Sequence, residues 1–187
     1  MEISLRKATA IQNNINDVLK TLDFNYTARI TEYEDSAKVI SELQDKFGQN
    51  IARRERLLEA LYAIRKSVGS ANLKEGIDVR MADAAHLEKQ IQFYTGLSTS
   101  KIKMADEVIQ GKLSKLKTAD SNTRLYRDDI IETSVFSQQD LTNFKSIVNF
   151  ARKKRQKIQD EILELNVRTT ISITSEVEKT LKDEGIL

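Results

Sequence analysis

The chain has 187 residues, which is enough for one domain with a hydrophobic core or for one elongated unit. Its 30 basic and 28 acidic residues nearly balance, which argues against a surface built to coat nucleic acid. The chain lacks cysteine, which excludes disulfides and thiolate metal sites, and it lacks proline, which favours uninterrupted helices. We therefore predict a mainly α fold of long antiparallel helices, paired as coiled-coil-like hairpins, with a small β element.

The first third of the chain predicts two helices separated by a strand. A helix is expected after Ser4, because apolar residues recur on one face from Ala8 to Leu22. Residues 24–30 then alternate between apolar and polar, which is typical of a short strand. A second long helix is expected from about Asp35 to Val68, with Gly48 as a possible kink. Its apolar face consists of Ala37, Ile40, Leu43, Phe47, Ile51, Leu58, Leu61 and Ile64.

The middle of the chain predicts a turn, a returning helix and a weaker third helix. Residues 68–76 contain two glycines and are expected to form a loop. The apolar residues that follow Ile77 predict a helix that Gly96 stops, so that residues 35–95 form an antiparallel hairpin. Residues 102–116 predict a short amphipathic helix, residues 118–124 a loop, and residues 125–135 an extended segment.

The clearest pattern in the chain predicts a helix over residues 137–166. Ser137 is the expected N-cap, Asp140 can accept hydrogen bonds from free N–H groups, and Phe136 with Leu141 can form a hydrophobic staple. The residues that follow recur at steps of three and four, as in a coiled-coil seam. We predict that a self-interface is formed by this seam and by the apolar face of the second long helix. The seam residues are Leu141, Phe144, Val148, Ala151, Arg155, Ile158, Ile162 and Leu165.

The end of the chain predicts a strand and a short helix. Residues 167–174 alternate between apolar and polar, and Ser175 with Glu178 has the spacing of a capping box before a helix that ends at Gly185. We expect residues near 24–31, 125–135 and 167–174 to pair in a small sheet. Because no linker or internal repeat divides the chain, residues 1–187 are predicted to form a single helical domain.

Two basic clusters are candidate sites for an anionic ligand, either a nucleotide or a nucleic acid. The first cluster is Arg152, Lys153, Lys154, Arg155 and Lys157, and the second is Arg53, Arg54 and Arg56. The alternative for the first cluster is a solvated helix face whose charge is offset by carboxylates one turn later, at residues 160–164. If the two clusters meet across subunits, they would form an anion-binding ring.

Arg155 stands at a seam position, where a charged side chain needs an explanation. It can face a carboxylate and so set register or oligomeric state, or it can extend its stem along the seam edge towards water. Both alternatives remain open from the sequence.

Catalytic and metal-binding patterns are weak. His86 is the only histidine, so an ordinary zinc site or a histidine-based triad is not expected. Glu161 with Glu164, and Glu42 with Asp45, have the spacings of a metal-dependent nucleotide hydrolase but occur in the reverse order. A separate candidate cluster is Asp128, Asp129 and Glu132. We expect no catalytic residue, no metal and no cofactor. No signal-peptide pattern and no apolar run of about 18 residues is present, which favours a cytoplasmic protein without a membrane span.

The order of these features resembles the septicolysin-like proteins, also called the DIP1984 family. The similar parts are the N-terminal helix, residues 64–76, the returning helix over residues 80–91, and the last third with residues 130–136 and 164–170. The resemblance implies a helical, coiled-coil-like subunit with a small β element, a homo-oligomer, and by its name a membrane-active lysin. The proline-free, Lys/Asp/Asn-rich composition also resembles that of a phage-encoded protein, which would act in the host cytoplasm or in the virion.

The function that the sequence favours is that of a non-enzymatic, oligomeric helical protein that acts by assembly, with a second copy of itself or with another protein. The alternatives are binding of an anionic ligand through the basic clusters, membrane lysis, and metal-dependent hydrolysis through Glu161 and Glu164.

Overall fold

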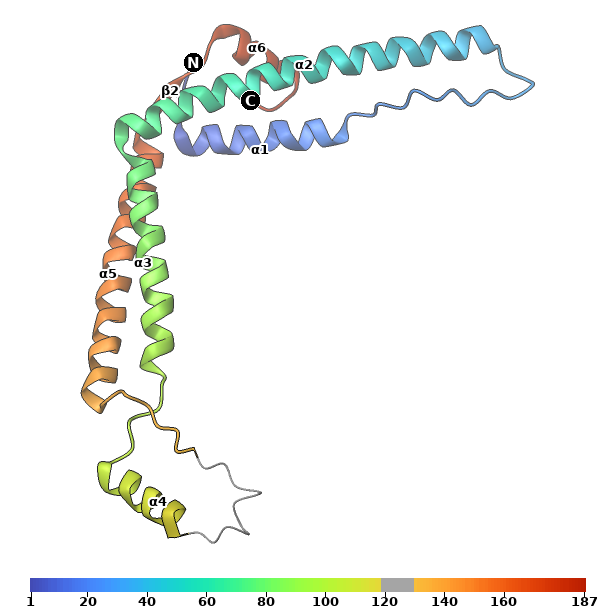
Figure 1. Ribbon diagram of the computed structural model, residues 1–187. Coiled ribbons are helices and arrows are strands. Elements are labelled where there is room, and N and C mark those ends of the chain that lie inside the picture. Colours follow the sequence, from blue (N-terminus) through green and yellow to red (C-terminus); the bar gives the residue numbers. More distant parts are fainter. Residues whose placement is uncertain (119–129) are drawn as a thin grey trace. The chain divides into compact units, whose positions relative to one another are not determined.

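A computed structural model describes residues 1–118 and 130–187, and this part of the chain is mainly helical (Figure 1). The elements in chain order are β1 (Glu2–Ser4), α1 (Leu5–Thr21), α2 (Ser36–Glu75), α3 (Ile77–Ser98), α4 (Asp106–Thr118), α5 (Gln138–Arg168), β2 (Thr170–Ser172) and α6 (Ser175–Asp183). The predicted fold class is confirmed. The chain divides into two compact units, Met1–Val79 with Glu161–Leu187, and Arg80–Asp160, which we describe separately.

The sheet of the first unit joins the two ends of the sequence. β1 pairs antiparallel with β2, with Ile3 opposite Ile171. The predicted strand at residues 24–31 is wrong, because local side-chain bonds shape the backbone there: the Asn25 and Thr27 N–H groups bond to the side chains of Asp23 and Asn25. Residues 130–135 also form no strand, and residues 125–129 lie outside the described residues.

The core of the first unit lies between α1, the C-terminal part of α2, α6 and the sheet. α1 begins where the sequence predicted, since the Ser4 hydroxyl caps it by accepting from the Lys7 N–H. The buried side chains follow helical spacing on each helix, as expected for amphipathic helices that share one core. They include Ala8, Ile11 and Ile15 of α1, Leu57, Leu61 and Ile64 of α2, Val177 and Leu181 of α6, and Ile3 and Ile171 of the sheet.

Helix α2 is longer than the sequence predicted. The expected loop over residues 68–76 is wrong: α2 continues to Glu75, and only Gly76 turns, with a φ of 66°. Gly69 fits in the helix, and the hydroxyls of Ser67 and Ser70 bond to carbonyls one turn earlier. Gly48 does not interrupt the helix either. The two arms of the predicted 35–95 hairpin fall largely in different units, so their pairing stays a prediction, as does the single domain.

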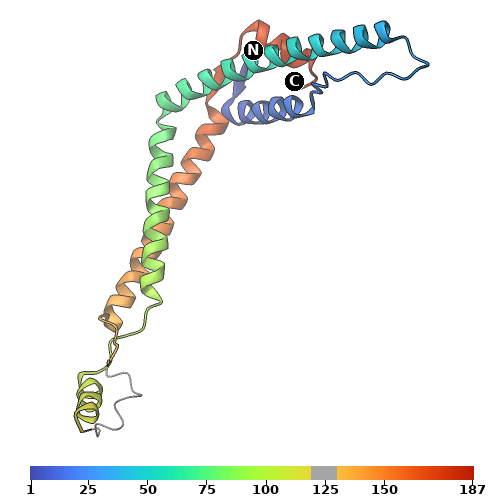
Figure 2. The same ribbon diagram turned by 45° about the vertical axis from the view of Figure 1, so that its right-hand side comes forward.

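In the second unit α3 packs against α5, and the two helices lie side by side in both views (Figures 1 and 2). Leu87 and Ile91 of α3 form a small core with Val148 and Ala151 of α5. The predicted start of α5 is confirmed, because the Ser137 and Asp140 side chains bond reciprocally to each other's N–H groups. The Ser137 hydroxyl, and after it the Ser137 N–H, donate to the Asp140 carboxylate and hold its pKa below the usual value.

Two smaller predictions for the second unit need correction. Gly96 does not stop α3, which runs on to Ser98. The next helix, α4, begins at Asp106 rather than at residue 102. The residues before it contact the segment before α5: the Lys103 N–H bonds to the Phe136 carbonyl at 2.7 Å.

The C-terminal helix α6 is capped one residue earlier than predicted. The Thr174 hydroxyl, and not that of Ser175, accepts from the Val177 N–H. The Glu178 carboxylate binds the Lys182 ammonium instead of completing a capping box. After α6 the chain turns at Gly185, with a φ of 67°, and Ile186 packs against the core.

Candidate functional site

Two arginines of the α2 cluster, Arg53 and Arg56, border one hollow, and Arg54 borders others. Arg53 Nε lies 2.9 Å from both carboxylate oxygens of Glu184, whose side chain is only 9% exposed. This pairing raises the pKa of Arg53, first through the hydrogen bonds to Glu184. Arg53 therefore fastens α2 to the segment after α6, and its charge is already matched.

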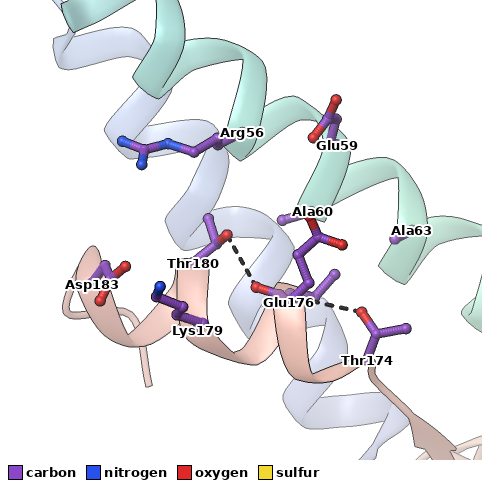
Figure 3. A pocket seen from close by; sticks show the side chains of 10 residues that line it. Arg56, Glu59, Ala60, Ala63, Thr174, Glu176, Lys179, Thr180 and Asp183 are labelled. Atoms are coloured by element: carbon purple, nitrogen blue, oxygen red, sulfur yellow. Dashed lines mark hydrogen bonds between the residues drawn. The ribbon is translucent and has the colours of Figure 1, made fainter.

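Arg56 lines a shallow hollow of about 340 Å³ between α2 and α6 (Figure 3). Its lining includes charged side chains of both signs and the apolar side chains of Ala60, Ala63 and Val177. The hydrogen bonds drawn in Figure 3 belong to α6 itself, such as the one from the Thr180 hydroxyl to the Glu176 carbonyl. Neither sign of charge dominates the lining, so the hollow has no evident preference for an anion. The charged lining residues are Arg56, Glu59, Glu176, Lys179 and Asp183.

Arg54 lies on a third side of α2. It borders a hollow shared with Asn13 and Asp17 of α1, and a second hollow beside Phe47. Within the described residues it forms no ion pair. Arg53 and Arg56 together border another hollow of about 590 Å³, with Glu55 and Glu59 beside them. Two of the three arginines that the sequence grouped together therefore share one hollow, in which carboxylates offset their charge.

The basic run of α5 is exposed, apart from one residue that is held by a partner. Arg155 Nε lies 3.1 Å from Glu88 of α3, and both side chains are 37% exposed. Of the two alternatives for this seam residue, the facing carboxylate is the one observed, and it comes from the same chain. Over residues 1–118 and 130–187, the other four basic side chains form no ion pair: Arg152, Lys153, Lys154 and Lys157. The two basic clusters lie in different units, so their meeting stays a prediction.

Seam residues of α5 pack against other elements of the same chain. Val148 and Ala151 contact α3, and Leu165 belongs to the core of the first unit. Phe144 packs against Tyr94 and Phe136, with ring centroids 5.8 and 5.3 Å apart. The seam is thus the buried side of α5, as its periodicity indicated, but its role as a self-interface stays a prediction.

The N-terminal part of α2 is the most exposed part of this helix. The segment before it contacts it through Asp23, which bonds to Lys46 and Asn50, and through Phe24. We call residues 36–56 the exposed half of α2, because none of them is buried. Ile40 and Ile51 are 42% and 39% exposed, although they lie on the apolar face that the sequence identified. Phe47 is half-buried, and its ring lies edge-on to that of Phe24, with the ring centroids 6.2 Å apart.

The preceding segment adds further apolar surface beside this half of the helix. Tyr26 and Tyr33 are 84% and 90% exposed. Tyr26, Phe24, Phe47 and Ile51 border a hollow of about 420 Å³. The sequence treated the whole apolar face of α2 as one surface. Asn50 and Arg54 interrupt that face just before its buried part, and this was the available signal that its two halves differ.

The described residues show no metal site and no membrane-spanning helix. Among them, no group of three or more His, Asp or Glu side chains is placed to hold a metal ion, and the candidates Asp128 and Asp129 lie outside them. Glu164 pairs with Arg168 at 3.5 Å. None of the described helices combines the length and apolar composition that crossing a membrane requires.

Comparison with known proteins gives no relative. No protein-family model matches the chain, no curated protein matches it, and no solved structure matches it. The resemblance to the septicolysin-like proteins therefore stays a prediction from sequence pattern, and the function has to be argued from the chain itself.

Proposed function

We propose that this chain is a non-enzymatic helical protein that acts by assembly, as a homo-oligomer or with another protein. The observation that carries the proposal is the exposed half of α2. It extends over about 30 Å, at 1.5 Å per residue, and presents apolar side chains along its length without burying one of them.

Physical chemistry supports a partner for such a surface. Most of the stability of a helix in a protein comes from packing its apolar face, and a short helix in water alone is marginal. Contiguous exposed apolar surface in a protein marks a place of interaction more often than a chance feature. An assembly that covers residues 36–56 would supply the packing that α1 and α6 supply to the rest of α2.

The test is the molar mass in solution. We expect light scattering and sedimentation to show an oligomer at micromolar concentration that dissociates on dilution. A particle with the mass of one chain, 21.3 kDa, at every concentration up to about 100 µM would contradict self-assembly, since stable assemblies form in the micromolar range or below.

A second candidate function, anion binding, is favoured by the basic run of α5. The cations of Arg152, Lys153, Lys154 and Lys157 are exposed without an ion-pair partner among the described residues. Because phosphate contacts are weakened by salt, a nucleic acid should bind at low salt and be released as salt rises. Replacing the three lysines with alanine should abolish binding, whereas replacing Lys101 and Lys112 should not. The absence of binding at low salt would end this candidate.

A further inference from the structure

One side of α5 combines an exposed aromatic ring with three lysines. The four residues stand at positions i, i+3, i+4 and i+7 of a continuous helix, a spacing that places them on one side of it. They are Phe150, Lys153, Lys154 and Lys157, and we call them the basic face of α5. The Phe150 side chain is 70% exposed, and the three lysines are exposed as well. The ring therefore meets solvent within two helical turns of three ammonium groups.

The two arginines of the same basic run lie on other sides of the helix. Arg152 follows Phe150 by two residues, which places it about 200° around the axis at 100° per residue. Arg155 is turned towards α3, where it pairs with Glu88. The run that the sequence presents as one cluster is thus divided, and only its lysines share a side with the phenylalanine.

The three lysines keep their charge for a ligand. Among the residues that the structure describes, none of the three forms an ion pair. Two carboxylates of the next turns are engaged elsewhere, since Asp160 accepts from the Gln156 amide at 2.9 Å and Glu164 pairs with Arg168. Glu161, four residues after Lys157, stands at the end of the basic face.

A ring among cations matches a ligand that has both flat rings and phosphates. Proteins that bind single-stranded nucleic acid stack bases on aromatic side chains while basic groups contact the backbone. In a duplex the base faces are stacked on one another, and a protein reaches only the base edges in the grooves. A ring such as that of Phe150 can therefore stack on a base only where the strand is unpaired.

We propose that the basic face of α5 binds single-stranded nucleic acid, with a base stacked on Phe150 and phosphates on the three lysines. This inference rests on the second candidate function, anion binding, and names its ligand. The face extends over about 10 Å, at 1.5 Å per residue, and so accommodates a few nucleotides.

Other polyanions match this face less well. A helix that lies on a membrane buries a wide apolar stripe among the lipid headgroups. Here Phe150 is flanked by a single exposed apolar residue, Ile147, at 38% exposure. An acidic peptide or a polyphosphate would use the lysines and leave the ring in water. The ring is therefore the feature that selects a ligand with bases.

The chain contains no tryptophan, so Phe150→Trp introduces a single indole that reports stacking directly. We expect an oligothymidylate of about 12 nucleotides to quench its fluorescence at low salt. The duplex of the same length and inorganic polyphosphate should leave the fluorescence nearly unchanged. Equal quenching by the duplex, or no quenching by the single strand, would overturn the proposal.

Binding of the labelled oligothymidylate, followed by fluorescence anisotropy, separates the ring from the charges. Phe150→Ala should weaken binding about fivefold or more and leave its salt dependence unchanged, because stacking involves no counterion release. Lys154→Ala should weaken binding and lower the slope of log affinity against log salt by about 0.7, the contribution of one phosphate contact on a single strand.

Arg152→Ala is the matched control, since it removes one exposed positive charge from another side of the same helix. It should leave both the affinity and the salt slope close to those of the wild type. An Arg152→Ala protein as impaired as Lys154→Ala, or a Phe150→Ala protein that binds like the wild type, would overturn the proposal. Circular dichroism establishes that the variants remain helical.

The outcomes separate this inference from the functions proposed above. If the wild-type chain binds neither oligothymidylate nor polyphosphate at low salt, anion binding and this inference fail together. If it binds both and Phe150→Ala has no effect, the lysines bind anions by charge alone, and only this inference fails. Assembly is measured separately by the molar mass, so neither result bears on it.

Discussion

The two halves of helix α2 share one amphipathic pattern and have opposite surroundings. In the C-terminal half, residues 57–75, Leu57, Leu61 and Ile64 are 2% exposed or less, because α1 and α6 cover them. In the exposed half, Ile40 and Ile51 remain in contact with solvent. An apolar face therefore indicates that a helix needs a partner, but it does not indicate whether the same chain supplies it.

The largest expected difference between the two halves is in the cost of removing an apolar side chain. Leu61→Ala should lower the free energy of unfolding by about 2–5 kcal/mol, because it leaves a cavity in a packed core. Ile40→Ala should change it by less than about 0.5 kcal/mol in the dissociated chain, as surface substitutions do. Urea denaturation at low protein concentration measures both. Equal losses would mean that the two halves are equally packed.

The border between the halves can be tested at Arg53. Arg53→Ala should cost about 1–2 kcal/mol, because it leaves the nearly buried carboxylate of Glu184 without its partner. The figure is at the low end because Arg53 itself is 42% exposed and partly screened by solvent. Arg56→Ala, three residues later, is the matched control and should have almost no effect. Thermal or urea unfolding of the two variants measures the difference. If Arg53→Ala does not lower the free energy of unfolding, the Arg53–Glu184 ion pair does not stabilise this part of α2.

One glycine in each half of α2 allows a test in which the substitution is expected to stabilise the helix, by a smaller amount than the preceding substitutions destabilise the protein. A β-carbon added at Gly48 or at Gly69 would meet nothing within 4 Å, so alanine fits at both positions. Gly69→Ala should raise the global free energy of unfolding by about 0.5–1 kcal/mol, the helix preference of alanine over glycine. Gly48→Ala should instead slow amide exchange around residue 48 and leave global unfolding unchanged. The same global gain from both variants would contradict independent behaviour of the exposed half.

The smallest expected effect is a pH response just before α2. The Thr31 N–H and hydroxyl bond to the Glu34 carboxylate and lower its pKa below the usual 4.5. A group whose pKa is lowered in the folded state stabilises that state above its usual pKa and loses the effect as the pH falls through the lowered value. Acidification below about pH 4 should therefore loosen this turn and the first residues of α2, without global unfolding. NMR titration measures the pKa of Glu34, and an ordinary pKa would contradict the hydrogen bonds from Thr31 that form this turn.

Local patterns predicted much of the fold because they act over a few residues. The Ser137–Asp140 cap and the buried side of α5 follow from one helical turn and from helical periodicity, and both were predicted. The loop over residues 68–76 was wrong because glycine and serine lower helix stability only modestly. α2 therefore continues through Gly69 and ends at Gly76, where the left-handed backbone suits glycine.

Pairing between distant segments could not be predicted in the same way. The strand over residues 170–172 lies within a predicted segment, but its partner is residues 2–4, which are too short to show an alternating pattern. Arg155 was recognised as unusual in its seam, whereas the choice of Glu88 as its partner depends on how α3 packs against α5. Likewise Arg53 is separated from Glu184 by 131 positions in the sequence.

The sequence alone determined that this protein is built from long amphipathic helices, where several of them begin, and which faces are apolar, because propensity, capping and periodicity are local properties. The tertiary structure decided which of those faces the chain covers for itself. It buried the seam of α5 and the C-terminal half of α2, and it paired Arg53 of α2 with Glu184. The exposure of residues 36–56 of α2 could be recognised only from the tertiary structure, because the burial of a side chain depends on every other element of the fold.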